Sequence, residues 1–141
     1  MTETTIAFVC VQNAGRSQMA HAFARREAKA RGVEEQVVLV TGGTDPADQV
    51  HEGVIAAMDA VGIDLRGITP REITFEETRT SEYVITMGCS ASNVCPAGWA
   101  GENRDWDLED PAGKPSETVA SIRNEIESRV TALFDEILAD K

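Results

Sequence analysis

The chain has 141 residues, 42% of them hydrophobic, which suits one domain with a buried core over residues 1–141 and is too apolar for a disordered chain. Its 24 acidic and 13 basic residues give a formal net charge of -11, which disfavours binding to nucleic acid or to an anionic membrane. The apolar runs are shorter than the ~20 residues of a membrane span, and no basic segment precedes the first of them as in a signal peptide. We therefore expect a cytoplasmic protein.

The first half of the chain alternates strand and helix patterns. Residues 5–9 form an apolar run that predicts a strand, and residues 17–30 carry apolar side chains at helical spacing. The apolar run at 37–40 is continuous, which is typical of a strand buried on both faces. Gly42-Gly43 and Pro46 follow this run, and we expect them to end the strand.

The second half of the chain continues the alternation. In chain order we expect helices at 50–61 and 72–80, strands at 83–87 and 105–108, and a helix at 116–138. The last helix has apolar residues at three- and four-residue steps, and Ser116 is its expected N-cap. Strands and helices in alternation predict an α/β fold with a parallel sheet and right-handed crossovers.

Residues with useful chemistry follow several of the predicted strands. Cys10, Gly42, Cys89 and Asp110 each come just after one of them. In an open parallel sheet, ligands bind outside the carboxyl ends of the strands. These four residues should therefore gather at one edge of the sheet, although they lie far apart in the sequence.

The most informative segment is residues 10–17, Cys-Val-Gln-Asn-Ala-Gly-Arg-Ser, which joins the first predicted strand to the first predicted helix. A loop this short can turn its N–H groups inward as an anion-binding nest, and the following helix adds the positive end of its dipole. Arg16 can hold two oxygens of a tetrahedral anion, and Asn13 can adopt the left-handed conformation. The expected oxyanion-binding residues are Val11, Gln12, Asn13, Ala14, Gly15 and Arg16.

Cys10 stands at the start of this loop. The positive field favours its thiolate, which is the nucleophilic form, and Ser17 is placed to donate a hydrogen bond to that thiolate. A Cys-x5-Arg pattern also arises by chance, and a buried cysteine at a strand end is often only a small hydrophobe. The surrounding order of strand, Asn, Gly, Ser and helix favours the catalytic interpretation.

The stretch from Val9 to Ala20 resembles the phosphate loop of the low-molecular-weight tyrosine phosphatase superfamily, and Arg16-Ser-Gln-Met-Ala20 resembles its arsenate reductase branch. Phosphatases of the superfamily usually have proline in place of Gln18. The likeness continues through residues 57–65, 84–89, 95–96 and 105–113. It implies a three-layer α/β fold with a four-stranded parallel sheet flanked by helices, and an enzyme that needs no cofactor.

The resemblance also implies a general acid. Asp110-Pro111 matches the acid motif of the family, and the proline restrains the loop and disfavours helix at the preceding residue. In the phosphatases, aromatic residues that stack on phosphotyrosine commonly follow this motif, whereas Ala112 follows it here. Tyr83 is expected in a strand. Trp99 and Trp106 could still stack on an aromatic substrate, so such a substrate is not excluded.

Two further cysteines, Cys89 and Cys95, resemble the redox segment of thioredoxin-coupled arsenate reductases. By that analogy Cys10 attacks arsenate, Cys89 then attacks Cys10 and releases arsenite, and Cys95 passes the disulfide on to a thioredoxin-like partner. The family usually has six residues between these cysteines and this chain has five, which leaves the order of the relay open. A small thiol or a glutaredoxin-like protein could replace one step, and the pair could also be incidental.

Some family members bind potassium near the loop. Asn13 and Asp64 match that site, but His21 replaces the usual glutamate, so we predict no metal site.

Together these observations favour a cytosolic, thiol-dependent arsenate reductase that serves arsenic resistance and retains residual phosphatase activity. Its substrate is a small oxyanion, arsenate or phosphate. The main alternative is a protein-tyrosine or small phosphomonoester phosphatase that uses the same loop. A non-catalytic phosphate-binding or redox-sensing module is the alternative from another class.

The acid-rich composition predicts that salt stabilises the fold. Only Lys29, Lys114 and Lys141 are lysines, and the excess of carboxylates repels itself until ions screen it. We expect the melting temperature to rise by a few degrees between low and molar salt, measured by circular dichroism. A melting temperature that stays constant or falls would contradict adaptation to high salt.

Overall fold

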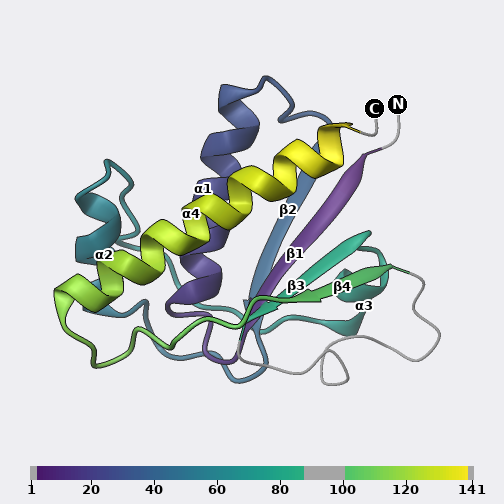
Figure 1. Ribbon diagram of the computed structural model, residues 1–141. Coiled ribbons are helices and arrows are strands. Elements are labelled where there is room, and N and C mark those ends of the chain that lie inside the picture. Colours follow the sequence, from purple (N-terminus) through teal and green to yellow (C-terminus); the bar gives the residue numbers. More distant parts are fainter. Residues whose placement is uncertain (1–2, 88–100, 140–141) are drawn as a thin grey trace.

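The computed structural model describes residues 3–87 and 101–139, in which four parallel strands form one sheet (Figure 1). The strand order is β2-β1-β3-β4. The strands are β1 (Thr4–Cys10), β2 (Val37–Gly43), β3 (Tyr83–Met87) and β4 (Glu102–Asp105). The predicted parallel sheet is therefore confirmed, with β1 and β3 at its centre.

Helices cover both faces of the sheet (Figure 1). They are α1 (Arg16–Ala30), α2 (Glu52–Asp59), α3 (Phe75–Arg79) and α4 (Ser116–Ala139). The helices α1, α2 and α4 pack together over one face, where the main core lies. The other face carries a smaller cluster in which Ala7, Val9 and Val84 meet Ile73, just before α3. This is the expected three-layer arrangement.

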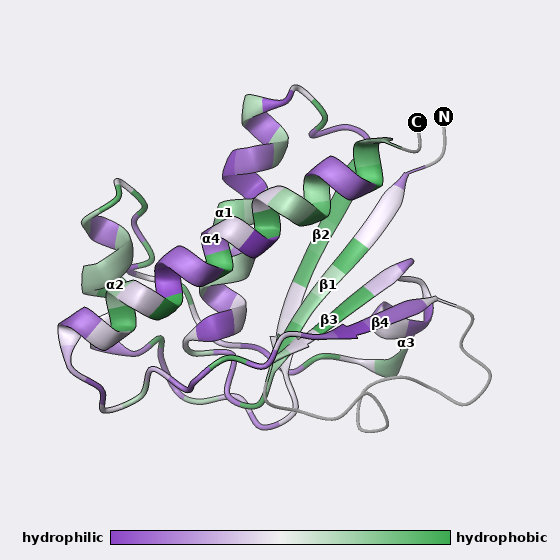
Figure 2. Cartoon of the chain, viewed as in Figure 1, coloured by the Kyte–Doolittle hydropathy of each residue, from purple (hydrophilic) through white to green (hydrophobic). Residues whose placement is uncertain are grey.

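Alternation along β1 explains the two cores. Ile6, Phe8 and Cys10 point into the main core, and the residues between them point into the smaller one. The stripe expected on α4 is buried: Val119, Ile122, Ile126, Val130, Leu133 and Ile137. Figure 2 shows the same division, with apolar colour on the central strands and hydrophilic colour on β4. Within residues 3–87 and 101–139, no helix is long and apolar enough to cross a membrane.

Several predicted boundaries differ from the structure. The strand expected at 105–108 lies at 102–105: its last hydrogen bond to β3 runs from the Trp106 N–H to the Thr86 carbonyl, and the Trp106 side chain packs on Phe8 at a ring distance of 6.2 Å. The helix expected at 72–80 begins at Phe75, after a capping box made by Thr74 and Glu77. The helix expected at 50–61 covers only 52–59. Ser116 was expected to be the N-cap of α4, but it is the first residue of the helix, one position after the N-cap.

Strand β2 departs most from its prediction. It lies at an edge of the sheet, so it is not buried on both faces, and Val38 is 37% exposed. It also continues through Gly42 and Gly43, which were expected to end it. Gly43 pairs with Cys10, and a Cβ at this position would stand 2.5 Å from the carbonyl oxygen of Val11. The glycine thus lets β2 pass close to the loop after β1.

This close approach predicts opposite effects for two glycine substitutions. Gly43→Ala forces the loop or β2 to shift, and we expect a loss of ~1–3 kcal/mol in the free energy of unfolding together with weaker phosphate binding. Gly53→Ala, in α2, meets only a methyl group at 3.9 Å and should add ~0.5–1 kcal/mol. Urea unfolding and phosphate titration measure both, and equal effects of the two variants would contradict the crowding argument.

Candidate active site

A cavity of about 270 Å³ opens at the carboxyl ends of the strands. It is lined by Cys10, Val11, Gln12, Gly15, Arg16, His51 and Asp110. Gly42 and Gly43 lie at the same edge, in register with Val9 and Cys10. The structure therefore brings together three of the four residues expected there. The fourth, Cys89, and its neighbour Cys95 lie outside the described residues.

The backbone of the loop after β1 is oriented by the segment at 44–51. Four N–H groups of that segment donate to carbonyl oxygens of the loop, at 2.8–3.2 Å. These oxygens belong to Cys10, Val11, Gln12 and Ala14. Because a trans peptide directs its carbonyl and the next N–H in opposite directions, the N–H groups of residues 11, 12, 13 and 15 point the other way, toward the cavity. The N–H of Asn13 accordingly donates to Cys10 Sγ at 3.1 Å.

Asn13 is the centre of the loop. It has the expected left-handed backbone, with φ of 53°, and is fully buried. Its Nδ2 donates to Ser17 Oγ at 2.8 Å and to Thr41 Oγ1 at 2.9 Å. Its Oδ1 accepts from the backbone N–H of Arg71 and from Gln18 Nε2, both at 3.0 Å. Gln18 Nε2 also donates to the Asn13 carbonyl, at 3.0 Å.

These contacts fix the orientation of the Asn13 amide. The backbone N–H of Arg71 can only donate, so the amide oxygen of Asn13 must face it and the amide nitrogen must face Ser17. Ser17 Oγ accepts from Asn13 and lies 2.8 Å from Cys10 Sγ; a thiol and a hydroxyl can each donate in such a pair, but a thiolate can only accept the Ser17 proton. A hydrogen bond to the charged form favours that form, so the arrangement stabilises the thiolate.

Arg16 and Asp110 lie next to each other in the lining of the cavity. The Arg16 side chain is 11% exposed, its guanidinium donates to the carbonyl of Leu108 at 3.0 Å, and its NH2 forms an ion pair with Asp110 Oδ2 at 4.0 Å. The Asp110 side chain is 56% exposed, and its Oδ1 accepts from the N–H of Ala112. Pro111 packs so closely on the loop that a Cβ at Gly15 would lie 3.0 Å from its ring. The Asp-Pro segment is thus held against the anion-binding loop.

The aromatic side chains do not form a wall of the cavity within the described parts of the chain. Trp106 is 7% exposed and belongs to the core, and Tyr83 lies in β3 beneath Arg104. The remaining tryptophan, Trp99, lies outside the described residues.

Three residues of the site were not anticipated from the sequence. Thr41 joins the network through Asn13 and donates to the Phe8 carbonyl at 3.0 Å. Arg71 contributes its backbone N–H, and His51 lines the cavity. The glycine pair that follows Thr41 is a sequence signal for the close approach of β2 to the loop after β1. Nothing in the sequence singled out Arg71.

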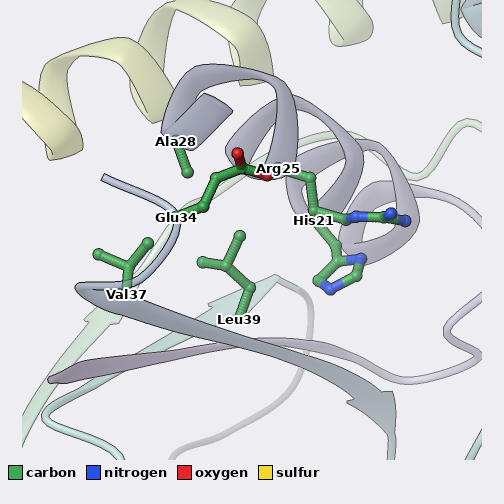
Figure 3. Close-up of a pocket in the computed structure, with 6 residues that line it drawn as sticks. All are labelled: His21, Arg25, Ala28, Glu34, Val37 and Leu39. Carbon is green, nitrogen blue, oxygen red and sulfur yellow. The ribbon is translucent and has the colours of Figure 1, made fainter. Parts of the chain in front are cut away.

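A second hollow lies away from this cavity, between α1 and β2 (Figure 3). It measures about 330 Å³ and is lined in part by His21, Arg25, Glu34 and Leu39. Burial lowers the pKa of His21, the charge of Arg25 lowers it further, and a hydrogen bond with the Leu39 backbone opposes both. Asp64, the other residue matched to a cation site, pairs with Arg66 at 2.9 Å.

Comparison with known proteins agrees with the fold. The family described as low molecular weight phosphotyrosine protein phosphatase matches residues 5–141. The chain belongs to this family.

Within the family, the chain is similar to arsenate reductases. A Halobacterium salinarum protein named "Putative arsenate reductase" is 49% identical over 97% of this chain and 95% of its own length. The "Glutaredoxin arsenate reductase" of Synechocystis is 33% identical over 94% of this chain and 97% of its own length. A solved structure of a thioredoxin-dependent arsenate reductase from Corynebacterium glutamicum is 31% identical, with a TM-score of 0.80 over 99% of this chain. This chain spans only 64% of that reductase's length.

The lowered pKa of His21 predicts a pH-dependent stability. The unfolded chain binds a proton at His21 near pH 6.5, whereas the folded chain binds it only at lower pH, so stability falls as the pH drops below about 6.5. Carboxylates stay ionised until lower pH and contribute little to this window. We expect the melting temperature to fall less between neutral pH and about pH 5.5 in His21→Gln than in the wild type. Arg25→Gln should give an intermediate slope, and identical slopes would contradict the assignment to His21.

Proposed function

We propose that this chain reduces arsenate to arsenite with Cys10 as the nucleophile, and so serves arsenic resistance. One observation carries the proposal: Cys10 Sγ accepts from the N–H of Asn13 at 3.1 Å and lies 2.8 Å from the Ser17 hydroxyl, which can donate to its thiolate. Relatives that carry the name arsenate reductase match nearly the whole chain and support the same activity. The three cysteines suit a reducing compartment, so we place the enzyme in the cytoplasm.

The first step forms a bond between sulfur and arsenic. The loop N–H groups and Arg16 hold the oxyanion, and the Cys10 thiolate attacks the arsenic atom while one arsenic–oxygen bond breaks. The departing oxygen needs a proton, which Asp110, another residue of the cavity lining, donates so that water leaves. Arsenic remains pentavalent in the resulting adduct.

The second step supplies the electrons. Cys89 attacks Cys10 Sγ, a disulfide forms, and the electron pair of the sulfur–arsenic bond passes to arsenic, which leaves as trivalent arsenite. Cys95 then exchanges with Cys89, and an external thiol reduces the final disulfide. This relay rests on the sequence and on the named relatives. One of those relatives is described as thioredoxin-dependent, and the name of another contains the word glutaredoxin. We therefore propose that a dithiol protein or a small thiol is the reductant.

The cavity favours a small oxyanion over an aromatic phosphate ester. In the described part of the chain its lining contains no phenylalanine, tyrosine or tryptophan that could stack on a phosphotyrosine ring. Hydrolysis of small phosphate esters remains a side activity, because arsenate and phosphate make the same contacts with the loop.

A pair of assays separates the two chemistries. One follows arsenate reduction with thioredoxin or with glutaredoxin and glutathione, and the other follows hydrolysis of an aryl phosphate. Cys10→Ser should lose both activities, because both begin with the thiolate. Cys89→Ser and Cys95→Ser should lose reduction and keep hydrolysis close to the wild-type rate, because only reduction needs the resolving thiols.

Ser90→Ala, in the same segment, is the matched control and should keep both activities. A wild-type protein that hydrolyses the ester but reduces no arsenate with any of these donors would overturn the reductase assignment. Reduction that survives in Cys89→Ser but not in Cys95→Ser would reverse the proposed roles of the two thiols.

A further inference from the structure

His51 meets the oxyanion loop through both its backbone and its ring. It is the N-cap residue of α2, and its N–H donates to the Ala14 carbonyl at 2.9 Å. Its Cδ2 lies 3.5 Å from the place where a Cβ on Gly15 would stand. The half-buried imidazole lines the same cavity as Cys10, Arg16 and Asp110. The imidazole of His51 would therefore lie next to an anion bound by the loop.

The charges of the cavity leave a role for a second cation. With the thiolate formed, Cys10 is negative and Asp110 adds a second acidic group, while Arg16 is the one arginine or lysine among the described lining residues, in a chain whose net charge is -11. Arg16 also gives one of its donors to the Leu108 carbonyl. A dianionic oxyanion adds two negative charges to this surplus. Among the described residues that line the cavity, His51 is the one remaining side chain able to become positive.

We propose that His51 is an oxyanion-binding residue whose imidazole takes up a proton when a dianion enters the cavity. The inference rests on the oxyanion site of the proposed function and adds a residue to it. The titratable and charged groups around the ring are Cys10 and Arg16 of the loop and Asp110, which precedes α4. Glu52, the first residue of α2, follows His51 directly in the chain. Because the bound dianion favours imidazolium, affinity for a dianion must rise as the pH falls through the range in which histidine titrates.

Sulfate tests this coupling cleanly, because it remains a dianion throughout that range and cannot be reduced by the relay. The background is Cys10→Ser, which removes the titration of the thiol from the measurement. Sulfate affinity is measured by calorimetry from about pH 5.5 to 8.5, on either side of the ordinary histidine titration. We expect the affinity to fall about tenfold in total between the acid and the alkaline end, and the slope of the logarithm of affinity against pH gives the fraction of a proton taken up on binding.

Three second-site variants assign the effect. Adding His51→Gln should give weak binding that does not change with pH, and adding His51→Arg should give tight binding that does not change with pH. Adding His21→Gln, the other histidine of the chain, should leave the profile of the Cys10→Ser background unchanged. Tight binding by the arginine variant would also show that the loop folds without the imidazole.

Calorimetry in two buffers of different ionisation enthalpy measures the proton directly on the Cys10→Ser protein, without any change at His51. Net proton uptake on sulfate binding at neutral pH supports the inference, and its absence overturns it. A His51→Gln variant that keeps the pH slope also overturns it, while the oxyanion site itself stands. Failure of the Cys10→Ser protein to bind sulfate at any pH would overturn both the inference and the oxyanion site of the proposed function.

Discussion

The site depends on one amide group, the side chain of Asn13. Its oxygen faces the backbone N–H of Arg71 and its nitrogen faces Ser17, whose hydroxyl lies 2.8 Å from Cys10 Sγ. The order of donors and acceptors starts from a backbone group that cannot reverse, so the Asn13 amide has one orientation. Because the network is buried and its polar side-chain atoms have partners, turning this amide over would set two donors against each other at Arg71.

The parallel sheet explains why such distant residues meet. Cys10 lies at the end of β1, and Thr41 and Gly43 lie at the end of β2, where Gly43 closely approaches the loop. The segments that follow these parallel strands lie at the same edge of the sheet. The segment at 44–51 then orients the loop carbonyls, and its last residue, His51, adds an imidazole to the wall of the cavity. The strands thus position residues whose chemistry comes from four separate segments.

Sequence reasoning succeeded for the conformation of one short segment. The strand–loop–helix arrangement and the left-handed Asn13 could be predicted because Cys10, Asn13 and Arg16 lie within eight consecutive residues, 10–17. The catalytic roles of these residues remain predictions. Sequence reasoning failed for β2, because an apolar run does not reveal whether its strand lies at the centre or the edge of a sheet. It also missed Arg71, which contributes only a backbone N–H, a group that every residue except proline possesses. The roles of Cys89 and Cys95 remain predictions.

The tether of Arg16 to Leu108 has a consequence for the entropy of binding. A free arginine on the surface samples many rotamers, and fixing such a side chain at a binding site costs ~0.5–1.5 kcal/mol. Here the Arg16 side chain is already only 11% exposed, and its guanidinium is held by the Leu108 carbonyl before any anion arrives. Folding, not binding, therefore bears most of that ordering cost. The attraction between Arg16 and a small anion can then appear almost fully as affinity, which matters for a ligand that has only a few atoms to contribute.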